Sequence, residues 1–274
     1  MFEKFYDKCR NYSITLNRLF IEGQPIIVMR FNRIFKIVIS TPGMKQLDRE
    51  VRNSQLALEW DIYSGRVVSL EKVAPFIAAA TFINETNSVS YIRKRQKLME
   101  LSINRLDSVL KAPKRAASDI LINRIHNLDI ELEKDHPVYT QFRELVNSNY
   151  FRFEIPVTPM HGDFLPGNSL LTEEKLLLID WEYALKEGSI LYDWWYLKFY
   201  IDIDKNYNEE TKNYFSFIEK ALEKINLSYD QFEAFGYAMI SSAYISAYEL
   251  KRIRDLKKCR KYIRELDRIV SGAN

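Results

Sequence analysis

Cysteine is scarce in this sequence of 274 residues, which contains Cys9 and Cys259 and has three histidines. No Cys-x-x-Cys pair and no cluster of cysteine with histidine occurs. We therefore expect neither a disulfide framework nor a structural zinc site, because both need several thiol or imidazole groups at close spacing. A reducing, cytoplasmic setting fits this composition best.

Long apolar runs are also absent. The longest, from Pro75 to Ile83, is far shorter than the ~20 residues that a membrane-spanning helix needs. The first residues, Met-Phe-Glu-Lys-Phe-Tyr-Asp-Lys, lack the apolar core of a signal peptide. We therefore expect a soluble protein. The formal net charge of +3 gives no reason to expect a specific nucleic-acid partner.

Two glycine motifs are missing as well. Without Gly-x-Ser-x-Gly, and with no cysteine close to a histidine, serine or cysteine hydrolase chemistry has no support. Without Gly-x-Gly-x-x-Gly, the sequence does not indicate which backbone amides would hold a phosphate chain.

The residues that are present predict an α+β protein with two parts. Runs of β-branched residues at 14–16, 26–29 and 34–39 predict three antiparallel strands. A helix ending near Trp60 and a strand or strand pair at 66–73 would complete a unit of about 75 residues. Beyond Pro75 the pattern is mostly helical. The expected segments there are helices at 90–110, 119–133, 139–146 and from 189 onward, and extended chain at 151–158 and 176–179. We therefore predict a small antiparallel-sheet lobe at 1–75 and a larger, mostly helical lobe at 76–274.

Two short segments carry the chemistry. Residues 160–168 read Met-His-Gly-Asp-Phe-Leu-Pro-Gly-Asn, and residues 176–183 read Leu-Leu-Leu-Ile-Asp-Trp-Glu-Tyr. They place Asp163, Asn168 and Asp180 close together in the chain. Phosphoryl transfer from ATP needs a carboxylate that orients the acceptor hydroxyl, and hard oxygen ligands for Mg²⁺. Asp163 suits the first task, and Asn168 and Asp180 suit the second.

These segments resemble the His-Gly-Asp-x-x-x-x-Asn loop and the Ile-Asp-Trp-Glu motif of the aminoglycoside phosphotransferase and choline/ethanolamine kinase superfamily. Leu-Tyr-Asp193 matches a further motif of that group. The resemblance implies a bilobal protein-kinase-like fold, ATP and Mg²⁺ as cofactors, Asp163 as catalytic base, and Asn168 and Asp180 as metal ligands. It also implies that His161 fixes the catalytic loop through hydrogen bonds instead of reacting.

The resemblance extends upstream. The family holds the ATP phosphates with a strand lysine that pairs with a helix glutamate. Lys36 lies in the predicted strand 34–39, and Glu50 follows it by 14 residues. The adenine-binding hinge is expected at 71–75, where Glu71 and Val73 would contact the base.

Other interpretations remain open at this stage. Asp163 and Asn168 could be turn formers, Asp180 a helix cap, and Lys36 a solvated strand residue. The carboxylate that pairs with Lys36 could also be Asp48 or Glu59 instead of Glu50. The whole chain could be a pseudokinase that binds nucleotide or a partner without turnover, which the missing glycine loop favours and the intact catalytic residues oppose.

Aromatic residues are dense beside the metal motif, and most of them are expected to fill the core. The members are Trp181, Tyr183, Trp194, Trp195 and Tyr196. The alternative, functional interpretation is that one or two of these aromatic residues line the acceptor site together with Glu182. Aromatic faces beside a carboxylate would suit a cationic or sugar acceptor. The candidate substrate residues are Trp181, Glu182 and Asp193, although Asp193 could instead brace the catalytic loop. Choline-like amino alcohols, aminoglycosides and surface sugars all remain as hydroxyl acceptors.

The C-terminal segment has an apolar stripe at helical spacing and is otherwise basic. The stripe consists of Leu250, Ile253, Leu256, Cys259, Ile263, Leu266 and Val270. Nine lysines and arginines against three acidic residues occur between Lys251 and Arg268. The segment could be a helix packed on the large lobe with a solvated basic face. It could alternatively contact an anionic partner, such as membrane lipid, lipopolysaccharide or nucleic acid.

Overall fold

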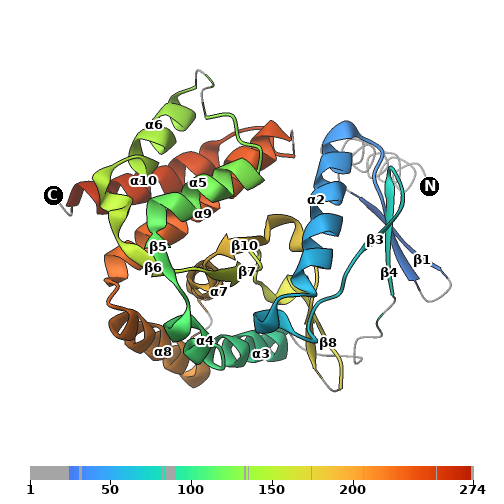
Figure 1. Ribbon diagram of the computed structural model, residues 1–274, viewed down its shortest axis with the longest axis horizontal. Helices are drawn as coiled ribbons and strands as arrows, with labels where there is room; N and C mark the ends of the chain where they lie inside the picture. The colour runs from blue at the N-terminus through green and yellow to red at the C-terminus, as the bar shows by residue number, and fades with distance from the viewer. Residues whose placement is uncertain are drawn as a thin grey trace, which may run out of the picture.

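The computed structural model has two lobes, with the sheet and one long helix on one side and the other helices grouped opposite (Figure 1). It describes residues 25–30, 33–81, 83, 91–132, 134, 136–173, 175–205, 207–250 and 252–272. The strand expected at 14–16, together with Cys9 and Gly23, lies outside the described residues. The predicted α+β bilobal fold is confirmed.

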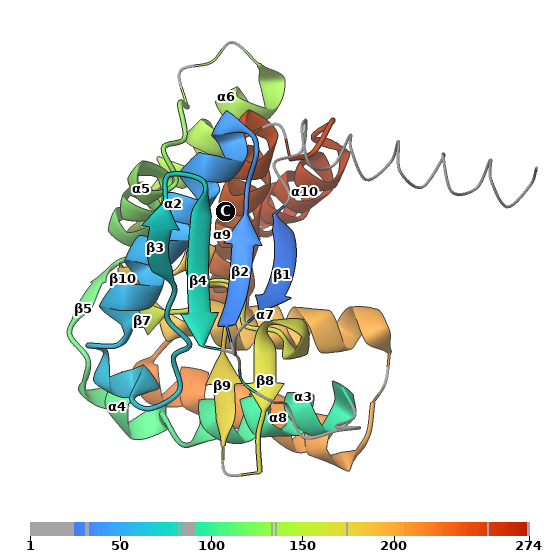
Figure 2. The same cartoon turned by 90° about the vertical axis from the view of Figure 1, so that its right-hand side faces the viewer.

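The small lobe is a four-stranded antiparallel sheet with the order β1-β2-β4-β3, seen face-on in Figure 2. Its strands are β1 (Ile26–Arg30), β2 (Arg33–Ile37), β3 (Glu71–Ala74) and β4 (Ile77–Thr81). Lys36 is on the inner strand β2, where it pairs with Ile27 of β1 and Ala78 of β4. Strands on both sides therefore fix the backbone that carries this lysine.

Helix α2 (Thr41–Ala57) packs on this sheet and continues toward the large lobe. The Ser40 hydroxyl caps its first turn by accepting from the Gly43 N–H at 3.3 Å. The helix shares a small apolar core with the sheet. That core consists of Val38, Leu47, Val51, Leu70, Ala78 and Ala80. The C-terminal end of helix α2 belongs instead to the core of the large lobe. Ala57 of the helix and the following Trp60 and Tyr63 are members of that core.

Strand β4 contradicts the prediction that the chain becomes helical directly after Pro75. Its residues 78–80 are all alanine, a strong helix former, yet they lie buried between β2 and β3. Tertiary context overrides helix propensity here, because small side chains fit a strand that is covered on its inner face.

The hinge prediction at 71–75 is wrong for the same reason. Residues 71–74 form β3 and pair with β4, so the expected boundary at residue 75 falls inside a hairpin of the small lobe. The sheet continues to Thr81, and α3 begins at Tyr91.

The large lobe is mostly helical. Its helices are α3 (Tyr91–Ile103), α4 (Leu106–Lys111), α5 (Ala117–Asn127), α6 (Pro137–Val146), α7 (Ile190–Asp204), α8 (Glu209–Ile225), α9 (Tyr229–Glu249) and α10 (Lys257–Gly272). The short strand pairs are β5 (Lys114–Ala116) with β6 (Glu154–Pro156), β7 (Thr158–Met160) with β10 (Leu185–Gly188), and β8 (Ser169–Leu171) with β9 (Leu176–Leu178). Single 3-10 turns occur at Asp61–Tyr63, Asn149–Arg152, Pro166–Asn168 and Trp181–Tyr183.

The C-terminal helix expected from Leu250 onward begins at Lys257 instead, and residues 250–256 separate it from α9. The apolar side of α10 is buried against α9 and α6, through residues that include Cys259, Ile263 and Leu266. Because of this interruption, residues 252 and 253 do not belong to either helix. Among the described residues, none of the helices combines the length and apolarity required to cross a membrane.

Candidate active site

The catalytic-loop segment leaves β7 through a turn that only glycine fits. Gly162 has φ +83°, and a Cβ built there would lie 2.2 Å from the Tyr183 carbonyl oxygen. The loop therefore passes directly over the segment that follows Asp180. Glycine is required both for the backbone conformation and for this close approach.

His161 is fully buried, and its ring joins the two motifs. Its Nε2 donates to the Ile179 carbonyl oxygen at 2.8 Å, and its Nδ1 accepts from the Asp163 N–H at 3.3 Å. Burial lowers the pKa of this imidazole, which suits a neutral ring that donates at one nitrogen and accepts at the other. The geometry is that of a loop-bracing residue, since both ring nitrogens are already engaged.

Asp193, near the start of α7, lies against the backbone of this loop. Its carboxylate accepts from the backbone N–H groups of His161 and Gly162, both at 2.8 Å, and from the Tyr63 hydroxyl at 2.7 Å. It is fully buried. The assignment of Asp193 as a substrate residue is therefore corrected: its carboxylate holds the backbone of His161 and Gly162.

Asp163 faces the cavity from the middle of the loop. Burial and then the negative charges of Asp180 and Glu182 raise the pKa of its carboxyl group to about 7, while hydrogen bonds from Asn168 and Tyr196 oppose the shift. A carboxyl group with such a pKa can accept a proton near neutral pH. The Asn168 amide Nδ2 donates to the Asp163 carbonyl oxygen at 3.0 Å, which ties the two ends of the loop together.

Asp180 follows β9 in the left-handed conformation, with φ +65° and ψ +62°. Such a backbone is uncommon for a residue with a side chain and occurs often at functional sites. Its Oδ1 lies 3.4 Å from the Lys36 Nζ, and this Nζ donates to the Glu50 Oε1 at 2.5 Å. Burial opposes the charge of Lys36, but Asp180 and Glu50 outweigh it and hold the pKa of the ammonium above its ordinary value. The structure thus brings together three residues that the sequence placed in separate segments.

Asn53 links the two lobes one turn after Glu50. Its Nδ2 donates to the carbonyl oxygens of Trp181, Glu182 and Ala184, at 3.0, 3.3 and 3.1 Å. Helix α2 is therefore attached directly to the segment that carries Asp180. Sequence reasoning missed Asn53, because a single polar residue on a helix gives no signal of a tertiary partner.

The oxygen atoms of Asn168 and Asp180 suit a magnesium ion. The amide nitrogen of Asn168 is used within the loop, so its Oδ1 is the atom left for a cation. Within the described ranges no group of three histidine, cysteine, aspartate or glutamate residues is placed to hold a metal. Mg²⁺ keeps waters and phosphate oxygens as ligands and takes few from protein, and the oxygens of an amide and a carboxylate are donors of the kind it prefers.

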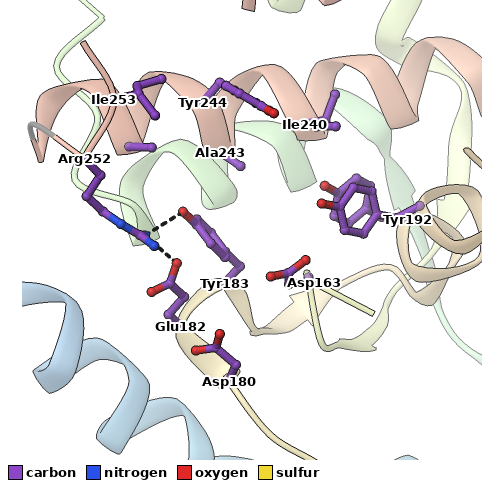
Figure 3. Close-up of a pocket in the computed structure, with 13 residues that line it drawn as sticks. Asp163, Asp180, Glu182, Tyr183, Tyr192, Ile240, Ala243, Tyr244, Arg252 and Ile253 are labelled. Carbon is purple, nitrogen blue, oxygen red and sulfur yellow. Dashed lines mark hydrogen bonds and ion pairs between the residues drawn. The ribbon is translucent and has the colours of Figure 1, made fainter. Parts of the chain in front are cut away.

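Beside these residues lies a cavity of about 350 Å³, shown in Figure 3. Its lining consists of Gly162, Asp163, Asp180, Glu182, Tyr183, Tyr192, Tyr196, Ile240, Ala243, Tyr244, Ala247, Arg252 and Ile253. Glu182 lines it as predicted for a substrate residue. Trp181 does not: it is fully buried, its ring packs against His161, and its Nε1 donates to the Leu178 carbonyl oxygen at 3.1 Å. The assignment of Trp181 as a substrate residue is corrected to a core residue.

The predicted aromatic cluster divides between core and cavity. Trp194 and Trp195 are fully buried, whereas Tyr183 and Tyr196 line the cavity. The other wall comes from α9 and the segment after it, which the sequence motifs did not reach. On α9 the lining residues recur at helical spacing, a regularity that also describes an ordinary buried helix face and so could not identify a site.

Glu71 and Val73 lie away from this cavity. Glu71 is on the edge strand β3 and pairs with Arg33 at 2.7 Å, and the Val73 side chain is largely exposed. Neither borders the cavity that Asp163 and Asp180 line. Their assignment as hinge residues is corrected, because both belong to β3, which pairs with β4 inside the small-lobe sheet.

No protein-family model and no curated protein sequence matches this chain. Solved structures do match. The choline kinase LicA from Streptococcus pneumoniae aligns over 90% of both chains at 17% identity, with a TM-score of 0.58. A complex of LicA with AMP aligns over 92% of this chain and 89% of LicA at 16% identity, with a TM-score of 0.56.

A gentamicin complex of the aminoglycoside phosphotransferase APH(2")-IIa also matches. It aligns over 93% of this chain and 95% of its own at 12% identity, with a TM-score of 0.50. The likeness covers both lobes, and it agrees with the motifs around Asp163 and Asp180. The chain therefore has the fold of the choline kinase and aminoglycoside phosphotransferase superfamily.

Proposed function

We propose that this protein is an ATP- and Mg²⁺-dependent phosphotransferase that moves the γ-phosphate to a hydroxyl group of a small molecule or glycan. One observation carries the proposal. The Lys36 ammonium and the Asp180 carboxylate lie 3.4 Å apart although 144 positions separate them in sequence, and Asp180 lines a cavity with Asp163. Such convergence of a lysine from one lobe with carboxylates from the other is what phosphoryl transfer requires.

Lys36 would bind the α- and β-phosphates while Glu50 holds its side chain in place. The 2.5 Å ion pair with Glu50 restricts the lysine to the side of the sheet that faces Asp180. Asn168 and Asp180 would hold the metal. Bound magnesium would neutralise charge on the phosphates during transfer.

Asp163 would orient the acceptor hydroxyl and accept its proton. It faces the cavity, and burial, followed by the charges of nearby carboxylates, raises its pKa to about 7, so the carboxylate is basic enough to receive a proton near neutral pH. Asp193 and His161 would hold the loop in place from below. These two residues act through Asp163 and need not touch either substrate.

The acceptor classes open to this site are amino alcohols such as choline, aminoglycosides and surface sugars. The names of the similar structures support the first two, and a cavity with four tyrosines and Glu182 supports all three. ATP as donor fits a cytoplasmic location. The exposed lysines and arginines of α10 support an additional contact with an anionic surface, such as membrane lipid.

A transfer assay with γ-labelled ATP and mapping of the product phosphate tests this function. Acceptors from the three classes should be compared in the presence and absence of Mg²⁺, with Asp163→Asn as the inactive control. Metal-dependent transfer to a hydroxyl that Asp163→Asn abolishes is the expected result. ATP binding that requires Mg²⁺, with no transfer to any class of acceptor, would favour a pseudokinase.

A further inference from the structure

Glu182 and Arg252 form an ion pair at the edge of the acceptor cavity. The Arg252 Nη1 donates to the Glu182 Oε1 at 2.6 Å and to the Tyr183 hydroxyl at 3.0 Å. Glu182 is 3% exposed, so its charge is compensated mainly by this guanidinium. The pair therefore presents little net charge to a ligand, although it contains the acidic residue that best suits a cationic acceptor.

The pair still has hydrogen-bonding capacity that the protein does not use. The Glu182 Oε2 is buried without a hydrogen-bond partner among the described residues. Both side-chain hydrogen bonds that the described part of the chain gives Arg252 come from Nη1, which leaves the donors on Nε and Nη2. The ion pair thus combines a buried acceptor atom that has no partner among the described residues with further donors on the guanidinium. A hydroxyl group satisfies both, because it donates one hydrogen bond and accepts others.

A second arginine lies behind the aromatic wall. The Arg124 guanidinium is fully buried, 5.4 Å from the centre of the Tyr183 ring and 6.0 Å from that of Tyr192. The electron-rich faces of these rings thus already interact with a positive charge. A cation on the cavity side of the same rings would be repelled by Arg124 from behind and by Arg252 from the edge. The apolar C–H face of a sugar ring carries no charge and meets no such repulsion.

We propose that Glu182 and Arg252 bind hydroxyl groups of a neutral polyhydroxylated acceptor, a sugar or cyclitol, and disfavour a permanently cationic amino alcohol. This inference rests on the proposed phosphotransferase function and narrows its acceptor. In Figure 3, Arg252 and Glu182 lie on one side of the Tyr183 ring, and Asp163 lies on the other. An acceptor that reaches both sides needs one hydroxyl at Asp163 and further hydroxyls at the pair. Choline has a single hydroxyl group, and its quaternary nitrogen neither donates nor accepts a hydrogen bond.

The test compares choline binding in the wild type and in Arg252→Gln, by calorimetry with Mg²⁺ and a non-hydrolysable ATP analogue. Removal of the positive charge should strengthen choline binding at least tenfold, since it leaves Glu182 uncompensated. Arg254→Gln is the matched control: this arginine lies two residues away and is exposed, so choline binding should not change. A wild type that binds choline as tightly as Arg252→Gln, or more tightly, would overturn the proposal.

Arg252→Lys provides a second readout if Arg252→Gln folds poorly. Lysine keeps the charge but loses the planar set of donors, so choline binding should stay weak.

Transfer kinetics with neutral acceptors test the other half of the proposal. The acceptors are myo-inositol, N-acetylglucosamine and methyl glucosides, and the wild-type kcat/KM for the best of them should be ten times that for choline. In Arg252→Lys, KM for that acceptor should rise at least fivefold with little change in kcat. A wild-type preference for choline, or an equal loss for all acceptors in Arg252→Lys, contradicts the proposal. A wild type that fails to bind Mg²⁺–ATP would refute the phosphotransferase function itself, and the two failures are thus separable.

Discussion

The Asp193 carboxylate accepts a hydrogen bond from the Gly162 N–H at 2.8 Å, and this contact holds the catalytic loop against α7. On the other side of Gly162, the Tyr183 carbonyl oxygen leaves no room for a side chain. The loop is therefore fixed from two sides, by a buried carboxylate and by the segment that carries Asp180.

Gly162→Ala should destabilise the protein and reduce turnover strongly. Alanine would have to adopt a positive φ, which costs about 1–3 kcal/mol, and its Cβ would meet backbone atoms that cannot move freely. Thermal unfolding and transfer kinetics measure both effects. Gly167→Ala is the matched control in the same loop, because a Cβ there has no atom within 4 Å. Equal melting temperatures for the two variants would contradict the requirement for glycine at position 162.

Asp163→Asn should keep nucleotide binding and reduce turnover by at least about 100-fold, because the amide cannot accept the acceptor's proton. Single-turnover transfer, together with calorimetric ATP binding, separates the two properties. Near-normal turnover in a folded variant would remove Asp163 from the role of base.

The pH dependence of kcat/KM should show a limb on the acid side. The raised pKa of Asp163 means that the carboxylate, which is the active form, is lost as pH falls through a value well above the ordinary 3.8. The rate should then fall tenfold per pH unit below that point. Burial is the largest cause of the shift, so it should persist when magnesium offsets the charge of Asp180. Glu182→Gln removes one of the smaller causes and should move the limb to lower pH. A rate that stays constant down to pH 5 would be incompatible with this assignment.

Asp180→Ala should abolish Mg²⁺-dependent ATP binding more severely than Asn168→Ala. A carboxylate contributes a full charge to the metal, whereas an amide contributes a dipole. Calorimetry with ATP, with and without Mg²⁺, compares the two variants. Equal metal dependence in the wild type and Asp180→Ala would exclude Asp180 as a ligand.

The sequence alone predicted the fold class and the candidate catalytic segments, because the motifs that indicate them consist of residues close together in the chain. Asp163 and Asn168 share one loop, and Asp180 ends the apolar strand that follows it, so their spacing was enough to predict a phosphotransfer site. Runs of β-branched residues likewise predicted the first described strands of the small lobe at nearly their observed positions.

Predictions from local sequence patterns were wrong where contacts with residues distant in the chain determine the secondary structure or the burial of a side chain. The alanines of β4 form a strand because β2 and β3 flank them, and this displaced the predicted hinge from Glu71 and Val73. Trp181 and Asp193 stand in motifs that could serve a substrate, yet the fold turns both into its interior.

Only the tertiary structure could bring Arg252 to the acceptor cavity. It lies 70 positions from Glu182, in a segment whose apolar spacing predicted a continuous helix, and the 2.6 Å ion pair forms because the chain leaves that path between α9 and α10. A charge pair across such a separation has no trace in local sequence, since the segment around each partner gives no indication of the other. The physical reason is general: spacing along a chain fixes helices, strands and loops, whereas the electrostatics of a cavity depend on which of them the fold packs together.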